Sequence, residues 1–329
     1  MAYMVETNGS AAAGPGRVVV GVNGALAGCR QALVFAAHEA RLRNATIRLV
    51  HGCEPLATLT ERQPAVPLVA RERQARRQLR DAADALRPLL DAGTAVEFRI
   101  DPRTGVDTLL DESTTAELIV LQRRELAALG RATAGSTSSA VAARAHCPVA
   151  VTRAGMRSAH QRSGVLVGVD GQVGAEAAVR MAFMRAAGRR ARLTAIQVLT
   201  QGEGGWGLPS WTYDISTTAH DRATSALAEL IDHYAGSFPG VVVAQIVVAG
   251  EEVDALREAT ASAELLVIGR YSGKQREARS LGSVARQLIN TARCPTLVTP
   301  PIQAGTDTGG SRVTSITDAR PQSSPLSAR

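Results

Sequence analysis

The sequence predicts an α/β protein built from two copies of one doubly wound unit with a parallel sheet. One reason is length, because 329 residues are too many for one ordinary domain and suit two of about 150. A second is that short apolar runs alternate with helix-like periodicity, which is typical of a parallel sheet with helices on both faces. The third is an internal repeat, which shows that the two halves share one fold.

The repeat appears when the two halves are compared at an offset of 147 residues. Four pairs of segments align at this offset. They are Gly21-Val22-Asn23-Gly24 with Gly168-Val169-Asp170-Gly171, Val106-Asp107 with Val253-Asp254, Gly135-Ser136 with Gly282-Ser283, and Cys147-Pro148 with Cys294-Pro295. We therefore divide the chain into a first repeat, 17–153, and a second repeat, 164–300. The tails 1–16 and 301–329 consist mainly of small and polar residues and are predicted to be disordered.

In the first repeat, apolar runs predict strands and 3.6-residue periodicity predicts helices. Strands are expected at Arg17 to Val22, Thr46 to His51, Ala95 to Ile100, Leu118 to Leu121 and Val149 to Thr152. Helices are expected at Cys29 to Arg43, along an Arg- and Ala-rich stretch to Leu90, at Val106 to Thr115 and at Ser136 to Ala145.

The second repeat follows the same order. Strands are expected at Val165 to Val169, Leu193 to Leu199, Val241 to Val248, Leu265 to Ile268 and Thr296 to Thr299. Helices are expected at Ala175 to Ala187, Thr217 to Ala235, Val253 to Ala261, and from Ser283 until Cys294-Pro295 ends the last one.

Composition narrows the class of protein. With 45% hydrophobic but only 3% aromatic residues, the core must be aliphatic and alanine-rich. The net charge of +7 comes from scattered arginines, and stretches such as Arg71 to Arg80 are interpreted as solvated helix faces rather than a specific nucleic-acid site. No apolar run approaches the roughly 20 residues that span a bilayer, and no export signal is seen, so a cytoplasmic protein without a membrane partner is expected. The four cysteines show neither disulfide nor metal-ligand spacing. Cys147 and Cys294, which precede a proline at equivalent places in the two repeats, are expected to be buried.

An anion site is predicted near the end of the second repeat. Gly269 ends an apolar strand, a cationic loop follows, and Gly282-Ser283 opens a helix. The start of a helix holds anions through free N–H groups and the positive end of its dipole, and glycine lets a phosphate approach the main chain. Arg270 and Lys274 add positive charge in the loop. We therefore place a phosphate here.

This spacing resembles the nucleotide loop of the universal stress protein family, in which Gly, two residues, Gly, nine residues and Gly precede Ser or Thr. Gly269 and Gly282-Ser283 match it, whereas Ser272 stands at the second Gly and Gly273 follows one residue late. The resemblance, to the tandem two-domain type of actinobacteria, covers roughly 17–300. It implies two five-stranded flavodoxin-like, adenine-nucleotide alpha-hydrolase-like sheets packed as a pseudo-dimer, with the first and fourth strands beside the ligand.

The resemblance also implies the site residues. The nucleoside end would be lined by Val169, Asp170 and Val198, and the phosphate end by Gly269, Arg270, Gly273, Gly282, Ser283 and Val284. An Asp at the end of a strand can accept hydrogen bonds from a ribose hydroxyl or an adenine amine. ATP is the expected ligand, AMP and cyclic AMP remain alternatives, and magnesium could accompany ATP.

The first repeat departs further from this pattern. Asn23 replaces the Asp, Gln122 replaces the first Gly, and Glu125 brings a negative charge where a phosphate would lie. Only Gly135-Ser136 is retained at the start of the helix. We predict that the first repeat binds nucleotide weakly or not at all.

The implied function is a stress-response binding and signalling module, not an enzyme. No nucleophile elbow, paired carboxylates or metal-ligand cluster is present, so no catalytic or metal residue is named. Two alternatives remain open: a structural or interaction protein that binds no nucleotide, and a slow ATPase with Asp170 as its metal carboxylate. A homodimer and an unidentified protein partner are also left open. Trp206, Trp211 and Tyr213 mark a loop that would serve as a lid or a partner surface, or would only pack against the other repeat.

Overall fold

In the part of the chain that the structure describes, ten strands and eight α-helices follow one another in the order that the sequence predicts. The computed structural model describes residues 16–53, 67–123, 137–156, 164–171, 175–200, 217–270 and 281–301. The strands are β1 (Arg17–Gly21), β2 (Thr46–Gly52), β3 (Val96–Asp101), β4 (Leu118–Arg123), β5 (Val149–Arg153), β6 (Val165–Val169), β7 (Leu193–Leu199), β8 (Val243–Ala249), β9 (Leu265–Gly269) and β10 (Thr296–Thr299). The α-helices are α1 (Arg30–Arg43), α2 (Leu68–Leu86), α3 (Gly105–Glu112), α4 (Thr137–Arg144), α5 (Ala175–Arg189), α6 (Thr217–Ala235), α7 (Glu252–Ala259) and α8 (Ser283–Thr291).

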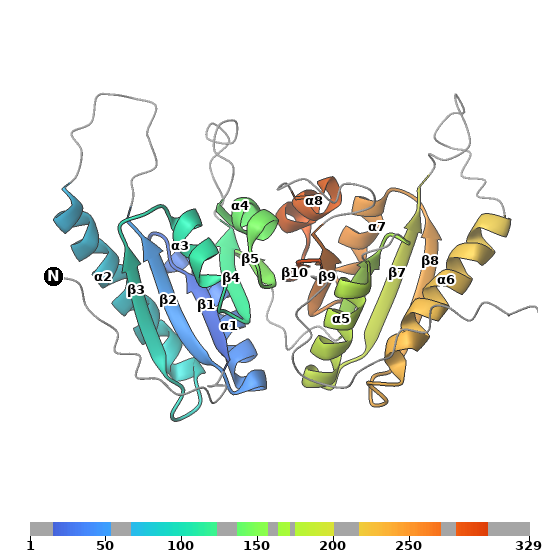
Figure 1. Cartoon of the computed structure of the whole chain (residues 1–329), viewed down its shortest axis with the longest axis horizontal. Helices are drawn as coiled ribbons and strands as arrows, with labels where there is room; N and C mark the ends of the chain where they lie inside the picture. The colour runs from blue at the N-terminus through green and yellow to red at the C-terminus, as the bar shows by residue number, and fades with distance from the viewer. Residues whose placement is uncertain are drawn as a thin grey trace, which may run out of the picture.

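The strands form one continuous sheet (Figure 1), in the order β3-β2-β1-β4-β5-β10-β9-β6-β7-β8. Within each repeat all neighbouring strands are parallel, which confirms the doubly wound α/β class. The two five-stranded units join edge to edge, because β5 and β10 pair in antiparallel fashion and place Ala150 opposite Leu297. The predicted pseudo-dimer is therefore a single ten-stranded sheet.

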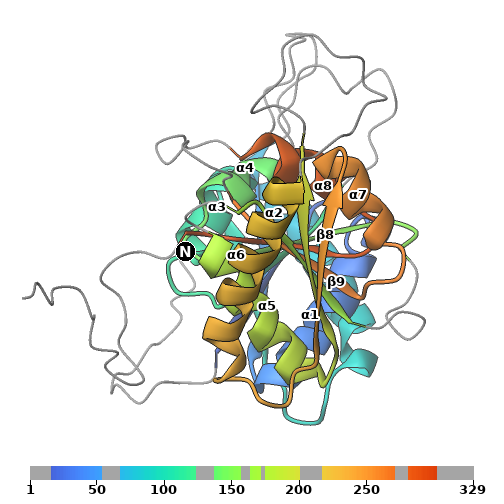
Figure 2. The same ribbon diagram turned by 90° about the vertical axis from the view of Figure 1, so that its right-hand side faces the viewer.

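Helices cover both faces of this sheet (Figures 1 and 2), and a hydrophobic core lies on each face. One core receives Leu33 from α1, Leu79 from α2, Phe183 from α5 and Leu227 from α6. The other receives side chains from α3, α4, α7 and α8. Both cores include residues of the two repeats, so the repeats share their hydrophobic interior.

The core is aliphatic, as the composition predicts. Phe183 is the one aromatic side chain among the buried hydrophobic residues of the described chain. Central strands such as β1 and β9 are apolar runs buried on both faces, as parallel strands between two helical layers must be. All four cysteines are buried and none is in a disulfide, which confirms the predicted burial of Cys147 and Cys294.

Most differences from the predicted boundaries are one or two residues at the ends of elements. The largest concerns the helix expected to reach Leu90, since α2 ends at Leu86 and a 3-10 helix, Arg87–Leu89, follows. Pro88 lies in that 3-10 helix and lacks the N–H that a continuing α-helix needs. The predicted tails 1–16 and 301–329 lie outside the described residues except for Gly16 and Pro301, and so does the Trp206 to Tyr213 loop.

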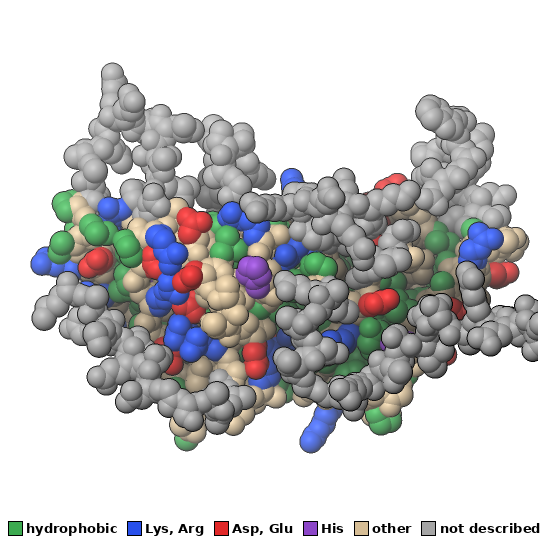
Figure 3. Space-filling model, viewed as in Figure 1, with side chains coloured by type: hydrophobic (Ala, Val, Ile, Leu, Met, Phe, Trp, Pro, Cys, Tyr) green, Lys and Arg blue, Asp and Glu red, His purple; other side chains and the backbone are tan. Residues whose placement is uncertain are grey.

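Arginine and carboxylate side chains of the first repeat form ion pairs with one another and do not form separate positive and negative patches. Arg48 and Arg99 both contact the buried carboxylate of Glu112, and Arg103 contacts Asp101. Figure 3 shows arginine and carboxylate side chains interspersed on this half of the molecule. The arginines of α2 mostly face solvent, as expected of a solvated helix. Within the described residues, none of the helices is both long and apolar enough to cross a membrane.

Candidate functional site

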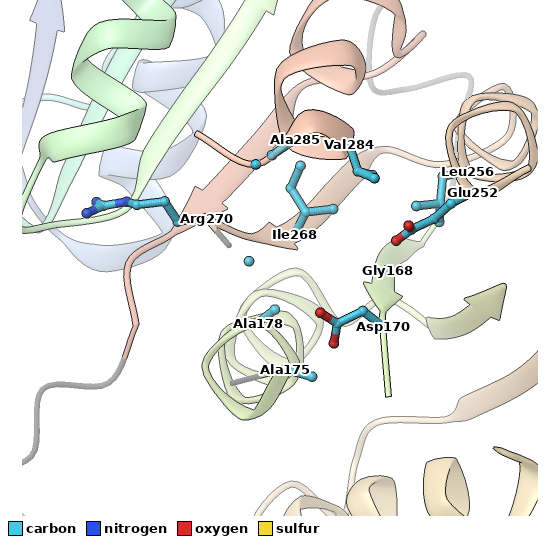
Figure 4. A pocket seen from close by; sticks show the side chains of 12 residues that line it. Gly168, Asp170, Ala175, Ala178, Glu252, Leu256, Ile268, Arg270, Val284 and Ala285 are labelled. Carbon is cyan, nitrogen blue, oxygen red and sulfur yellow. The ribbon is translucent and has the colours of Figure 1, made fainter. Parts of the chain in front are cut away.

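An open pocket lies at the carboxyl ends of β6 and β9 in the second repeat (Figure 4). β6 and β9 are neighbours in the sheet. The strand that follows β6 in the chain, β7, lies on one side of this pair, and the strand that follows β9, β10, lies on the other side, so the strand order reverses between β6 and β9. Ligands of doubly wound sheets bind at such a reversal. The empty space of the pocket, including its mouth, is about 470 Å3.

Small and aliphatic side chains form the walls of the pocket. Ala175 and Ala178 come from α5, Leu256 from α7, Ile268 from β9 and Ala285 from α8. Apolar walls suit the flat faces of an organic ring, and alanine leaves room for it because the methyl group is short. The walls therefore fit a base or another planar group.

The end of the pocket that is predicted to bind phosphate is built from main chain. Gly282 is the N-cap residue of α8 and carries no side-chain cap. Its own N–H donates to the carbonyl oxygen of Arg270 at 3.0 Å, and its carbonyl oxygen accepts from the N–H of Arg286. The first N–H groups inside a helix have no partner in the helix, so α8 presents donors beside a residue without a Cβ. This arrangement suits an anion.

Two carboxylates also line the pocket. Asp170 follows β6, and Glu252 is the first residue of α7. Figure 4 shows both side chains reaching into the pocket from different elements. Burial, and then the negative charge of Asp170, raise the pKa of Glu252. Carboxylate oxygens are hydrogen-bond acceptors, so this part of the pocket suits a ligand with hydroxyl or amine donors.

Replacing Glu252 with Gln is expected to raise the melting temperature near neutral pH by about 2 °C. A raised pKa means that the folded protein holds the proton more tightly than the unfolded chain does. Ionisation of Glu252 therefore destabilises the fold as pH rises from the ordinary value of 4.5 through the raised value, and the variant escapes this loss. Thermal unfolding of both proteins between about pH 4 and pH 8 measures the difference, which should vanish at the acid end.

Glu258→Gln is the matched control, because it removes the same charge from an exposed position on the same helix. It should leave the melting temperature unchanged at both ends of the pH range. If Glu252→Gln raised the melting temperature by the same amount in acid as near neutral pH, ionisation of Glu252 would not be the cause of the difference.

The structure brings five predicted site residues together: Asp170, Gly269, Arg270, Gly282 and Val284 all line the pocket. The pocket also contains residues that the sequence interpretation did not name. Glu252 is the most important of them, and its signal in the sequence was the acidic pair Glu251-Glu252 directly after Gly250. Gly273 lies outside the described residues. Within the described residues, no group of three or more His, Cys, Asp and Glu side chains could hold a metal ion.

Three predicted residues are not among those that line the pocket. Val169 is 3% exposed and packs into the core on the α1 and α5 face, because neighbours in a strand point to opposite faces and Gly168 takes the pocket side. Val198 packs against the other core. Ser283 begins α8, and its side chain is exposed to solvent.

Arg270 requires a correction of a different kind. Its main chain lines the pocket, but its side chain does not supply a cation to a phosphate there. The guanidinium is buried and donates to the carbonyl oxygen of Ala145 in the first repeat. Figure 4 shows the side chain directed away from the pocket. The reason is tertiary, since the junction of β5 and β10 brings the end of α4 within reach.

The first repeat fills the corresponding place with its own side chain. Gln122, at the position equivalent to Gly269, accepts from the N–H of Gln31 at 2.8 Å and donates to the carbonyl oxygen of Ala27 at 2.9 Å. The position equivalent to Gln31 at the offset of 147 is Ala178, which lines the pocket of the second repeat. The amide of Gln122 thus occupies the space that Gly269 leaves open.

Comparison with known proteins gives a consistent result. The sequence profile described as the Universal stress protein family matches residues 15–153 and again 163–300. A universal stress protein of Mycolicibacterium smegmatis is 30% identical over 292 residues, which are 86% of this chain and 97% of that protein. A universal stress protein of Mycobacterium tuberculosis is 32% identical over 188 residues, 56% of this chain and 62% of the relative. In that second alignment the chain therefore spans only about three fifths of the relative's length.

Among solved structures, the crystal structure of a universal stress protein from Archaeoglobus fulgidus superposes with a TM-score of 0.65. The superposition covers 87% of this chain and 96% of the other at 16% sequence identity. At that level of identity the likeness concerns the fold.

Proposed function

The chain belongs to the universal stress protein family, and from this premise we propose that its second repeat binds an adenine nucleotide and acts as a stress-response binding and signalling module. The observation that carries the proposal is the pocket between β6 and β9. It combines a helix start for phosphate, apolar walls for the base, and carboxylates for donor groups.

Each end of the pocket has a role in this proposal. The N–H groups at the start of α8 and the glycine at 282 would hold the phosphate, because a Cβ there would keep it away from the main chain. Asp170 and Glu252 would accept from ribose hydroxyls or from the adenine amine. ATP is our first candidate, with AMP and cyclic AMP as alternatives that share the adenine and at least one phosphate. Magnesium would enter with ATP, held mainly by its phosphates.

The nucleotide would act as a signal by favouring one conformation over another, which requires different affinities for the two. The first repeat would bind nucleotide weakly or not at all, because Gln122 fills its site. One site per chain is the expected stoichiometry.

The test is calorimetric titration of the full chain with ATP, ADP, AMP and cyclic AMP, with phosphate release measured in parallel. Saturable binding at one site per chain is expected. Gly282→Asp should weaken this binding at least about 30-fold, because a carboxylate facing the phosphate costs about 2 kcal/mol or more.

Gly240→Asp is the control, since a Cβ at this exposed glycine meets no atom within 4 Å. It adds the same charge far from the pocket and should bind as the unchanged protein does. If the folded chain binds none of the four nucleotides, the proposal is wrong and the structural or interaction role is favoured. Phosphate release that disappears with Asp170→Ala would instead identify a slow ATPase.

A further inference from the structure

Arg270 connects the main chain of the pocket to the other repeat. Its N–H donates to the carbonyl oxygen of Thr299 at 3.0 Å, and its carbonyl oxygen accepts from the N–H of Gly282 at 3.0 Å. These bonds link the end of β9 to β10 on one side and to the N-cap of α8 on the other. The main chain of Arg270 therefore determines where the start of α8 lies relative to Gly269.

The side chain of Arg270 is held by the first repeat. The residue is 7% exposed, and its Nη2 donates to the carbonyl oxygen of Ala145, directly after α4. Carbonyl groups at the end of a helix lack partners in the helix and lie at the negative end of its dipole, so a guanidinium suits this position. A buried charge that loses its partner costs several kcal/mol, which keeps the side chain in place.

The first repeat makes a similar connection in the other direction. Nη1 of Arg153 donates to the carbonyl oxygens of Asn290 at 2.7 Å and Ala292 at 3.3 Å, at the far end of α8. Arg153 is not among the residues that line the pocket. Each repeat thus supplies an arginine to the end of a helix in the other, but only Arg270 also forms part of the pocket.

We propose that Arg270 is a positioning residue, through which the first repeat holds the phosphate end of the second repeat's pocket in its binding shape. This inference rests on the proposed nucleotide site. It gives the first repeat a role although Gln122 fills its own site: the first repeat supplies the fixed point to which the start of α8 is attached.

The test replaces Arg270 with Met, which keeps the apolar stem and removes the guanidinium. Nucleotide affinity is measured by titration with ATP and AMP, and hydrogen exchange is measured in the ligand-free protein over residues 281–291. The variant is expected to bind at least tenfold more weakly and to exchange faster at the N–H groups of Gly282 and Arg286, which are hydrogen-bonded at the start of α8. Arg270→Lys keeps the charge, so it should recover part of the nucleotide affinity and part of the protection from exchange. The Lys variant also replaces the Met variant in the test if the Met variant fails to fold.

Arg153→Met is the matched control, because it removes a guanidinium from the far end of the same helix. It should lower the melting temperature but change the affinity less than twofold. An equal loss of affinity in Arg153→Met, or a Met variant of Arg270 with either its affinity or its exchange unchanged, would overturn the inference. If the unchanged protein binds no nucleotide, the proposed function fails. Hydrogen exchange of the Arg270→Met variant then decides this inference by itself: faster exchange at Gly282 and Arg286 supports positioning by Arg270, and unchanged exchange refutes it.

Discussion

Replacing Gly269 with Gln is expected to abolish nucleotide binding by the second repeat, with an affinity at least 100-fold lower, or about 2.7 kcal/mol. The first repeat shows why, since Gln122 lies at the end of β4 as Gly269 lies at the end of β9. Its amide reaches the start of α1 and is fixed there by bonds to Gln31 and Ala27. A glutamine at 269 would extend toward Ala178, in the space that the ligand needs. Calorimetric titration with ATP and AMP measures the loss.

The fold should tolerate this change, because the equivalent strand already carries a glutamine in the same place. The reciprocal variant, Gln122→Gly, is the matched control and should leave the affinity of the second repeat unchanged. Retention of binding within threefold by a folded Gly269→Gln protein would contradict both the location of the site and the interpretation of Gln122.

Replacing Glu39 with Gln is expected to lower the free energy of unfolding by about 3 kcal/mol or more. The side chain of Glu39 is 1% exposed and contacts three arginines, Arg43 on its own helix and Arg185 and Arg189 on α5 of the other repeat. Arg189 also contacts Glu264 at 3.0 Å. Removing the negative charge of Glu39 takes this carboxylate away from Arg43 and Arg185 and leaves Arg189 with Glu264. Breaking a buried ion pair in this way costs far more than the pair itself contributes. Urea denaturation followed by circular dichroism measures the loss.

Glu72→Gln provides the comparison, because Glu72 pairs with Arg76 at 3.8 Å on the exposed side of α2. This substitution should lower the free energy of unfolding by less than about 0.5 kcal/mol, as is usual for exposed ion pairs. Similar denaturation midpoints for the two variants would mean that the cluster around Glu39 does not connect the repeats energetically.

Much of the fold could be predicted from the sequence because the information is local. Apolar runs such as Leu193–Leu199 and periodic stretches such as Thr217–Ala235 have the predicted boundaries in the structure. The repeat then fixes the order of the strands in both halves, since two copies of one pattern fold alike. The position of the pocket follows from that order, because the reversal lies between the first and fourth strands of the repeat.

The remainder of the site could not be predicted because it depends on contacts between distant segments. Glu252 and Asp170 are 82 residues apart and meet only because α7 packs over the end of β6. Glycine at 282 was predictable from helix-capping chemistry, whereas the exposure of the Ser283 side chain was not.

The sequence by itself determined the α/β class, the two repeats, the aliphatic core and the glycines of the pocket, because each depends on residue type and spacing along the chain. The tertiary structure alone decided that Glu39 is buried, that Arg270 points into the other repeat, and that β5 and β10 merge two sheets into one. The physical reason is that a charged side chain is buried only where a partner compensates its lost hydration. Arg185 and Arg189, which contact Glu39, and Ala145, which accepts from Arg270, belong to the other repeat, at least 100 residues away in the chain.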